Sequence, residues 1–170
     1  MGGTIGGGPG IAMPGLEIAE QRAWENFLDA TLRIYGSLNR TLSDGHKLTL
    51  VDVRLLHILD ASESGSSRMG DLAEQLVSLP SRVTRQIRRL EDAGLVQRKA
   101  SPEDGRGVLA SITDRGRDVV AAAMVTYSEA VRQQFLAPLS RPQISALGEN
   151  CRRLSEAVRA SGSSGGIGRP

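Results

Sequence analysis

The sequence predicts a mainly α-helical protein with one small β-hairpin, and three observations lead to this fold class. Only 3% of the residues are aromatic in a chain that is 39% hydrophobic, and an aliphatic core suits packed helices better than a β-sandwich. Most apolar residues recur at the three- and four-residue spacing of an amphipathic helix. One short segment, residues 107–112 (GVLASI), alternates apolar positions as a strand does. With 170 residues, the chain is long enough for one domain with its own core.

The chain opens with a glycine-rich segment, residues 1–15, which holds seven glycines and two prolines. This composition predicts a disordered leader, and residues 161–170 are predicted to form a similar flexible tail. The opening segment has neither the basic start of a secretion signal nor the continuous apolar run of a membrane span. A phosphate-binding loop is also not expected there, because no strand precedes the glycines and no Gly-Lys-Ser/Thr motif follows them.

Two helices are predicted in the first third of the chain. The first covers residues 16–42 and should end at Gly45; its apolar residues recur at mixed three- and four-residue spacings. Thr49, followed three residues later by Asp52, is a weaker form of the capping box and predicts the start of the second helix. That helix continues toward Asp60 and is so rich in apolar residues that we expect it to be the central scaffold.

Two further short helices are predicted close together, at residues 71–77 and 81–90. In the second, three apolar residues at i, i+4 and i+7 share one face, and the opposite face is cationic. A cationic helix face is usually just a solvated surface, but residues 81–99 hold six Arg or Lys against two acidic residues. Two short helices on a tight turn, the second one basic, form a helix-turn-helix, the motif that places a recognition helix in the major groove of DNA.

A β-hairpin is predicted to follow this motif. Gly94 can adopt the left-handed conformation that ends a helix, and residues 95–98 then have the pattern of a strand. Residues 101–105 (SPEDG) form a turn that leads into the strand at 107–112. A short third strand at residues 68–69 would complete a small sheet. A charged hairpin behind a helix-turn-helix is a wing, so the predicted fold is a winged helix-turn-helix flanked by N- and C-terminal helices.

Two helices are predicted after the hairpin. Thr113 is a suitable N-cap for the first, which should run to about Pro138, and residues 140–143 (SRPQ) form a capping box for the last, which extends to Val158. The helices at both ends of the chain carry apolar stripes that a domain of this size has too little core to cover. We therefore expect them to be dimerisation helices that close against a second copy. The alternative is a monomer that folds them onto its own core.

The combination of these motifs resembles the MarR family, the multiple-antibiotic-resistance regulators. The resemblance lies in DLAEQL, in the helix SRVTRQIRRLEDAGLVQR, in the hairpin tip SPEDGRG and in the exit SITDRG, and it extends over residues 16–158. It implies a homodimer joined by its terminal helices. The implied MarR-like domain covers 16–160, with a winged helix-turn-helix at about 49–112 between dimerisation helices at about 16–42 and 113–160.

The basic helix and the resemblance together predict an interface for double-stranded DNA. Because the net charge is only +2, binding must depend on where the charge sits. At the hairpin tip, the resemblance implies a wing arginine, Arg106, that enters the minor groove while Asp104 holds it extended. Relatives usually open the recognition helix with Ser or Asp, and Leu79-Pro80 stands there instead, which leaves the helix start open by a residue or two. The residues expected at base edges are Ser81, Arg82, Thr84 and Arg85, and those expected at phosphates are Arg88, Arg89, Arg98 and Lys99.

The sequence does not point to an enzyme, a metal site or a cofactor. His46 and His57 have no cysteine near them, and His57, within an apolar helix, is more typical of a hydrogen-bonded structural histidine. Cys151 lies on the apolar line of the last helix, where a buried, inert thiol is expected. A lone cysteine forms no intrachain disulfide, which fits a cytoplasmic protein. Trp24 is expected to anchor the first helix to the rest of the domain.

The primary hypothesis is therefore a DNA-binding transcriptional regulator, a ligand-responsive homodimeric repressor that binds a pseudo-palindromic operator. Some branches of the resembled family bind urate or phenolic acids between the dimerisation helices and the DNA-binding module. A small anionic aromatic effector is accordingly an expected partner, and no membrane is. The alternative hypothesis is a ligand- or protein-binding module of the same fold that lacks DNA-binding activity.

Overall fold

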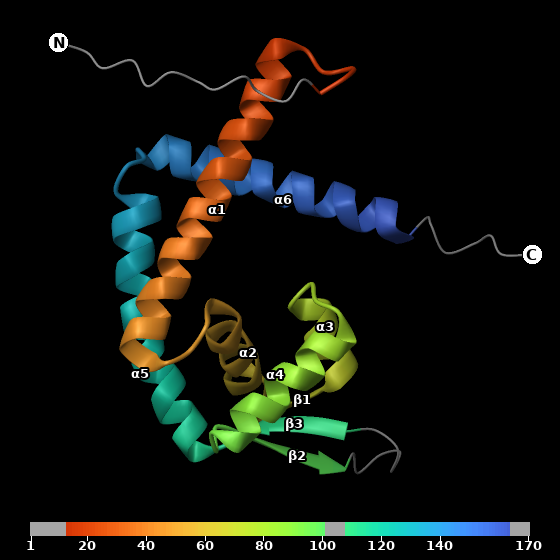
Figure 1. The fold of residues 1–170 in the computed structure, drawn as a ribbon, viewed down its shortest axis with the longest axis vertical. Coiled ribbons are helices and arrows are strands. Elements are labelled where there is room, and N and C mark those ends of the chain that lie inside the picture. The colour runs from red at the N-terminus through yellow and green to blue at the C-terminus, as the bar shows by residue number, and fades with distance from the viewer. Residues whose placement is uncertain (1–12, 101–107, 164–170) are drawn as a thin grey trace, which may run out of the picture.

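A computed structural model describes residues 13–100 and 108–163 of the chain (Figure 1). Within these ranges no helix is both long enough and apolar enough to cross a membrane. The structure confirms a mainly helical fold with a small sheet. The described elements are α1 (Ile18–His46), α2 (Leu50–Ala61), β1 (Ser66–Arg68), α3 (Met69–Gln75), α4 (Pro80–Asp92), β2 (Val96–Ala100), β3 (Val108–Ile112), α5 (Asp114–Val131), the π-helical turn η1 (Arg132–Leu136) and α6 (Arg141–Ser163).

The molecule has a compact base and a long helical arm. Figure 1 shows α2, α3, α4 and the sheet gathered at the base, while α1 and α5 run beside each other and pack together. From the end of α5 the chain turns, and α6 crosses above the base in this view. In the described part of the chain, α6 does not pack closely against any other element.

The hydrophobic core is built around α2. Leu55, Leu56 and Leu59 are fully buried, and α1, α5, β1 and β3 all pack on this helix. This arrangement confirms that the second helix is the central scaffold. Helices α3 and α4 pack against each other and add buried side chains to the same core: Leu72, Ala73, Val83, Ile87 and Leu90.

The three strands form one antiparallel sheet in the order β1-β3-β2. In the hairpin, Val96 pairs with Ile112 and Ala100 pairs with Val108. On the other side of β3, Ser66 pairs with Ser111, and their hydroxyl oxygens are 2.7 Å apart. The predicted third strand therefore exists, but it lies at Ser66–Arg68 and not at residues 68–69.

The helix caps form where local side-chain chemistry predicts them. The Thr49 side chain accepts from the backbone N–H of Asp52, and the Asp52 carboxylate accepts from the backbone N–H of Thr49, which completes the capping box of α2. The Thr113 hydroxyl accepts from the Gly116 N–H at 3.0 Å, and Gly94 follows α4 with a positive φ of 71°. At the start of α6, the backbone N–H of Ser140 donates to the Gln143 side chain at 2.8 Å.

Several predicted boundaries are wrong. Helix α1 continues through Gly45, because a glycine near a helix end weakens the helix without breaking it, and the left-handed residue that ends α1 is Lys47 at φ 58°. Helix α3 begins two residues early, at Met69, since the strand before it is earlier than expected. The last part of the predicted fifth helix is a π-helical turn, Arg132–Leu136, that follows α5.

Much of the apolar surface of the terminal helices is exposed in the single chain. Trp24 is 48% exposed, and its ring packs beside that of Phe27 with 6.1 Å between centroids. The expectation that Trp24 anchors α1 to the domain is wrong for the single chain, because the core contacts of α1 begin farther along, at Leu38 and Leu42. The exposed large apolar residues of α1, α5 and α6 are Ile18, Trp24, Phe27, Leu28, Leu32, Tyr35, Val125, Leu154 and Val158.

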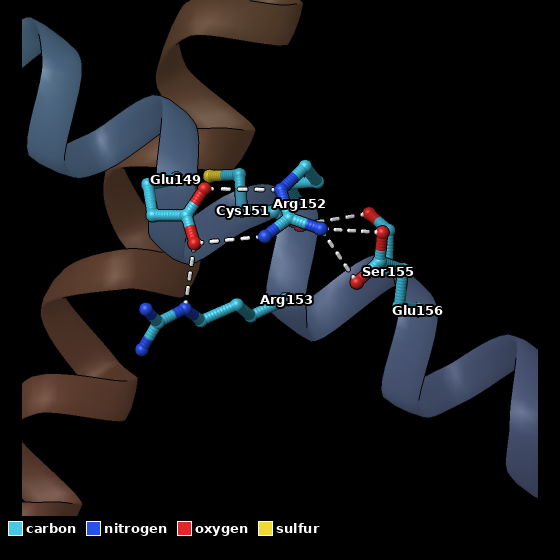
Figure 2. Close-up of polar contacts among 6 residues, drawn as sticks. All are labelled: Glu149, Cys151, Arg152, Arg153, Ser155 and Glu156. Carbon is cyan, nitrogen blue, oxygen red and sulfur yellow. Dashed lines mark hydrogen bonds and ion pairs between the residues drawn. The ribbon is translucent and has the colours of Figure 1, made fainter.

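Along α6, a charged cluster links side chains of one helix to each other (Figure 2). The Arg152 guanidinium donates to Glu149 at 2.8 Å and to Glu156 at 2.6 Å, and Arg153 donates to Glu149 at 2.8 Å. The hydrogen bonds from Arg152 and Arg153 lower the pKa of the Glu149 carboxyl, and those from Glu149 and Glu156 raise the pKa of Arg152. All of these contacts have the i, i+3 or i, i+4 spacing of neighbours on a helix surface.

Candidate nucleic-acid interface

Helices α3 and α4 are joined by a tight turn that fixes where α4 begins. After Leu76, Val77 adopts a left-handed conformation with φ 49°, and the N–H of Ser78 returns to the carbonyl of Ala73 at 2.9 Å. Leu79 is then extended, and Pro80 takes the first position of α4. Proline suits this position because its fixed φ is helical and its missing N–H is not needed there. The helix start that the sequence left open is therefore Pro80.

The two faces of α4 differ sharply in exposure and charge. Val83, Ile87 and Leu90 are buried against the base. On the outward side, the side chains expected at base edges lie near the start of the helix. Ser81, Arg82, Arg85 and Arg88 are exposed, and Thr84 is half-buried, with its hydroxyl donating to the Pro80 carbonyl at 2.9 Å.

A buried carboxylate lies between α2 and α4. Asp52 is fully buried, and its side chain accepts from the Thr49 N–H at 2.7 Å and from the Thr49 hydroxyl at 2.6 Å. The same carboxylate accepts from the Gln86 amide and pairs with the guanidinium of Arg89. Arg89 was expected at a phosphate; the structure shows that at least part of its guanidinium already binds within the protein. The sequence identified Asp52 only as a capping residue, and no local signal links it to α4.

A second ion pair links the end of α4 to the first wing strand. Arg98 of β2 donates to Glu91 through its guanidinium at 2.7 Å and through its backbone N–H at 3.2 Å. These hydrogen bonds lower the pKa of the Glu91 carboxyl, and the positive charges of Arg98 and Arg88 add to the effect. Lys99, the next residue of β2, is exposed. Asp104 and Arg106, expected to act at the wing tip, lie outside the described residues.

Beside α4 is a cavity of about 460 Å³. It lies where α1, the start of α2 and α4 face one another, and it combines aromatic, amide and cationic groups. Asn39 of α1 also fixes the start of α2, because its side-chain oxygen accepts from the Leu50 N–H at 2.9 Å. The cavity is lined by Tyr35, Asn39, Thr49, Val51, Arg82, Arg85, Gln86 and Arg89.

The residues considered for other chemistry are dispersed. His46 of α1 contacts the Thr126 hydroxyl of α5 at 2.7 Å, whereas His57 is exposed on α2. The structural histidine is therefore His46, and the expectation for His57 is wrong because its position points out of the core. Cys151 is a free, partly buried thiol in the single chain rather than a buried one. No group of three or more potential metal ligands is found within residues 13–100 and 108–163.

Comparison with known proteins identifies the family of this fold. The family model described as MarR family matches residues 48–108. The HTH-type transcriptional repressor Rv2887 of Mycobacterium tuberculosis is 38% identical over 98 residues, which cover 56% of this chain and 67% of the relative.

Two solved structures from Streptomyces coelicolor resemble the whole fold. AbsC, a MarR family transcriptional regulator, superposes with a TM-score of 0.81 at 28% identity and covers 87% of this chain and 99% of its own. Sco3205, a MarR family transcriptional regulator solved in complex with DNA, also gives a TM-score of 0.81, at 31% identity, over 84% of this chain and 93% of its own. The arrangement of the helix-turn-helix, the wing and the terminal helices, together with these similarities, establishes that the chain belongs to the MarR family of transcriptional regulators.

Proposed function

We propose that this chain is a DNA-binding transcriptional repressor that acts as a homodimer on a pseudo-palindromic operator. The observation that carries the proposal is the polarity of α4. Its apolar face is buried in the base, and its opposite face exposes Ser81, Arg82, Arg85 and Arg88. A rigid helix with an exposed hydroxyl and exposed arginines near its start matches the side chains that recognise base edges in the major groove.

The proposed division of roles follows position along the helix and wing. Ser81, Arg82, Thr84 and Arg85 contact base edges because they lie toward the start of α4. Arg88 and Lys99 contact phosphates and set the register on the duplex. Arg98 also contacts phosphates, through the N–H groups of its guanidinium that do not bind Glu91. Arg106 and Asp104 remain proposed for the minor groove.

The terminal helices provide the proposed dimer interface. Val125 and Val158 are each more than two-thirds exposed in the single chain, at 73% and 72%, and α1 adds a row of exposed aromatic and aliphatic residues. Exposed apolar surface of this extent marks an interaction site, and a second copy supplies equally apolar helices. We accordingly propose that residues 16–160 form the domain, with the DNA-reading module at about 49–112 between dimerisation helices.

The cavity beside α4 is the proposed effector site. It offers an aromatic ring from Tyr35, an amide from Asn39 and the exposed cationic side chains of Arg82 and Arg85, while Arg89 in the same lining is paired with Asp52. These groups suit a small anionic aromatic molecule, which would stack on the ring and pair with a guanidinium. Such a ligand relieves repression only if it binds the DNA-free conformation more tightly than the DNA-bound one.

Selection of bound duplexes from a random DNA pool tests the proposed function. The full-length chain is expected to enrich a two-fold symmetric sequence whose half-sites lie about one helical turn apart. It should bind that sequence about 10³-fold or more tightly than scrambled DNA at physiological salt. Failure to enrich any sequence, with a folded dimer present, would favour the alternative of a ligand- or protein-binding module of the same fold.

A further inference from the structure

We propose that Asp52 is a positioning residue for DNA recognition: it holds α4 in its orientation through Gln86 and Arg89, so that Arg89 acts on the protein rather than on the DNA backbone. This inference rests on the proposed function, because it concerns how the recognition helix is presented. It assigns to a buried carboxylate in the scaffold helix a part in sequence discrimination.

Asp52 is a charged group that is completely buried. The Asp52 side chain is 0% exposed, and removal of a carboxylate from water is unfavourable unless it is paired and hydrogen-bonded. The Thr49 N–H and hydroxyl, at 2.7 and 2.6 Å, supply two of its hydrogen bonds from within α2. Both remaining partners, Gln86 and Arg89, come from α4, and Arg89 brings the compensating charge.

The contacts of Asp52 with Gln86 and Arg89 are directional, whereas the apolar packing of α4 is much less so. Val83, Ile87 and Leu90 form an apolar face, and burial of such a face sets which side of the helix points inward but tolerates small rotations of the helix about its axis. Hydrogen bonds and charge-assisted contacts require particular distances and angles. Two such contacts, from Gln86 and Arg89 on one side of α4, restrict rotation of the helix about its own axis.

Rotation of α4 matters because of the exposed arginines on the same side of the helix. Arg82 and Arg85 are exposed near Gln86 and Arg89, and all four line the same cavity. A base contact by arginine requires its guanidinium to meet two acceptors at once. A helix that can roll presents these arginines over a range of directions, which weakens discrimination between sequences more than it weakens attraction to phosphate.

Arg89 is committed in part to the buried carboxylate of Asp52. Its side chain is 50% exposed, so it lies at the edge of the cavity, with part of the guanidinium turned to Asp52. A phosphate that drew Arg89 away would leave a buried carboxylate without its counter-charge, which opposes the exchange. Arg88, the preceding residue, is exposed, and among residues 13–100 and 108–163 it is not bonded to a buried group. The two neighbours are therefore expected to differ in function although both are basic.

The test compares Asp52→Asn, Arg89→Ala and the control Arg88→Ala in the full-length chain. Each protein is titrated with the sequence enriched from the random pool and with a scrambled duplex of equal length, over a series of salt concentrations. We expect Asp52→Asn and Arg89→Ala each to reduce the ratio of specific to non-specific affinity by about tenfold, with the salt slope of the parent. Arg88→Ala should leave the ratio intact and flatten the slope by about one.

Two further variants separate positioning from a merely structural role. In the double variant Asp52→Asn/Arg89→Gln, two neutral amides replace the ion pair. We expect its ratio of specific to non-specific affinity to be partly recovered, so that the loss is smaller than the losses of the two single variants combined. Gln86→Ala removes the hydrogen bond from α4 to Asp52 while the Asp52–Arg89 ion pair remains. This variant tests the proposal if the charge variants do not fold. It too should lower the ratio without changing the slope.

Three results would overturn the proposal. The first is a flattened salt slope for Arg89→Ala, equal to that of Arg88→Ala, which would make Arg89 a phosphate contact. The second is an unchanged ratio in folded Asp52→Asn or Gln86→Ala. The third is a loss of thermal stability in these variants with discrimination fully retained, which would make the contacts purely structural. If the unaltered chain enriches no DNA, the proposed function itself fails, and this role fails with it.

Discussion

At the scale of single residues, Arg85 and Lys99 represent the two kinds of DNA contact. Both are exposed, one near the start of α4 and the other on β2. We expect Arg85→Ala to weaken binding to the cognate site by about 1–3 kcal/mol and to relax preference at one or two base pairs per half-site. Lys99→Ala should weaken binding to all sequences alike and reduce the salt slope by about one. Identical behaviour of the two variants on cognate and scrambled DNA would contradict this division.

Val77, in the turn before α4, is held in an unfavourable backbone conformation. It has φ 49° and is 87% exposed, so burial of its side chain contributes little to stabilise this conformation. A left-handed residue with a Cβ costs roughly 1–2 kcal/mol, which exceeds the roughly 0.5–1 kcal/mol that glycine loses through its greater freedom in the unfolded chain. We expect Val77→Gly to stabilise the fold by about 0.5–1 kcal/mol in chemical denaturation.

The control for this prediction is Val77→Ala, which keeps the Cβ and removes only the branching. It should gain less than the glycine variant. A glycine variant that is less stable than the parent would show that the left-handed turn carries no strain.

The behaviour of individual side chains was predictable where it depends on neighbours in the chain. The sequence identified Thr49 as a cap and Asp52 as its partner, because a capping box lies within four residues. It did not predict that the same carboxylate is buried against Arg89, because that contact depends on how two separate helices pack. For the same reason it assigned the structural role to His57 instead of His46, whose partner Thr126 is on another helix.

At the scale of elements, Gly116 allows α5 to begin directly against the wing. A Cβ at this position would collide with the backbone carbonyl of Leu95 and with the side chain of Ile112. Neither can move freely, since one is backbone and the other is a core residue. We expect Gly116→Ala to destabilise the fold by about 1–3 kcal/mol, as overpacking does, when unfolding is followed in urea.

Gly70 of α3 is the matched control, because a Cβ there meets no atom within 4 Å. Gly70→Ala should be neutral or stabilise the helix by up to about 1 kcal/mol. Equal effects of the two alanine variants would mean that α5 does not depend on the close approach at Gly116.

The Glu91–Arg98 link between α4 and β2 should be sensitive to acid. Hydrogen bonds from Arg98 lower the pKa of the Glu91 carboxyl in the folded state, so its contribution is complete above the unfolded pKa of about 4.3 and is lost as the pH falls through the lower folded pKa. Glu91→Gln should therefore lower the melting temperature at neutral pH. The difference from the parent should shrink as the pH falls below the ordinary glutamate range. A difference that widens in acid would contradict the assigned direction.

The type and order of the elements were largely predictable, and their ends were less so. Caps at Thr49, Gly94 and Thr113 follow from side chains or glycine at the helix ends, so the sequence located them correctly. The end of α1 was misplaced because Gly45 is tolerated near a helix end and Lys47 adopts the left-handed conformation instead. A π-helical turn such as η1 changes the hydrogen-bond spacing without a distinctive residue pattern.

At the scale of the whole molecule, dimerisation should depend on α6. Deletion of residues 140–170 would remove this helix from both copies. The exposed apolar surfaces of α1 and α5 would then lack the partner helix proposed to cover them. We expect the shortened chain to be monomeric or aggregated in sedimentation and to lose tight operator binding. Removal of residues 164–170 alone is the control, because it spares α6, and it should leave the dimer intact. A soluble, well-folded dimer without residues 140–170 would overturn this assignment.

The apolar stripes of the terminal helices were visible in the sequence, but the surroundings of each side chain were not. Trp24 has the size and spacing of a core residue, yet it is exposed in the single chain, because the core contacts of α1 begin only near Leu38. An apolar stripe in the sequence predicts that one face of a helix is buried, but it does not predict which element or partner buries that face. The wing tip is a different case, since the expected roles of Asp104 and Arg106 concern residues outside the described ranges and remain predictions.

The charged cluster of Figure 2 has a consequence for how two chains would meet. Arg152 donates to carboxylates on both sides along α6, Glu149 and Glu156. These contacts stabilise the helical conformation from within α6, without side chains of neighbouring elements. At 23 residues it also exceeds the roughly 12–15 residues below which isolated helices are marginal in water. Both features favour formation of helix α6 before a partner arrives. Encounter of two chains would then join surfaces that already have their shape, and the rate of assembly would follow chain concentration rather than a slow folding step after contact.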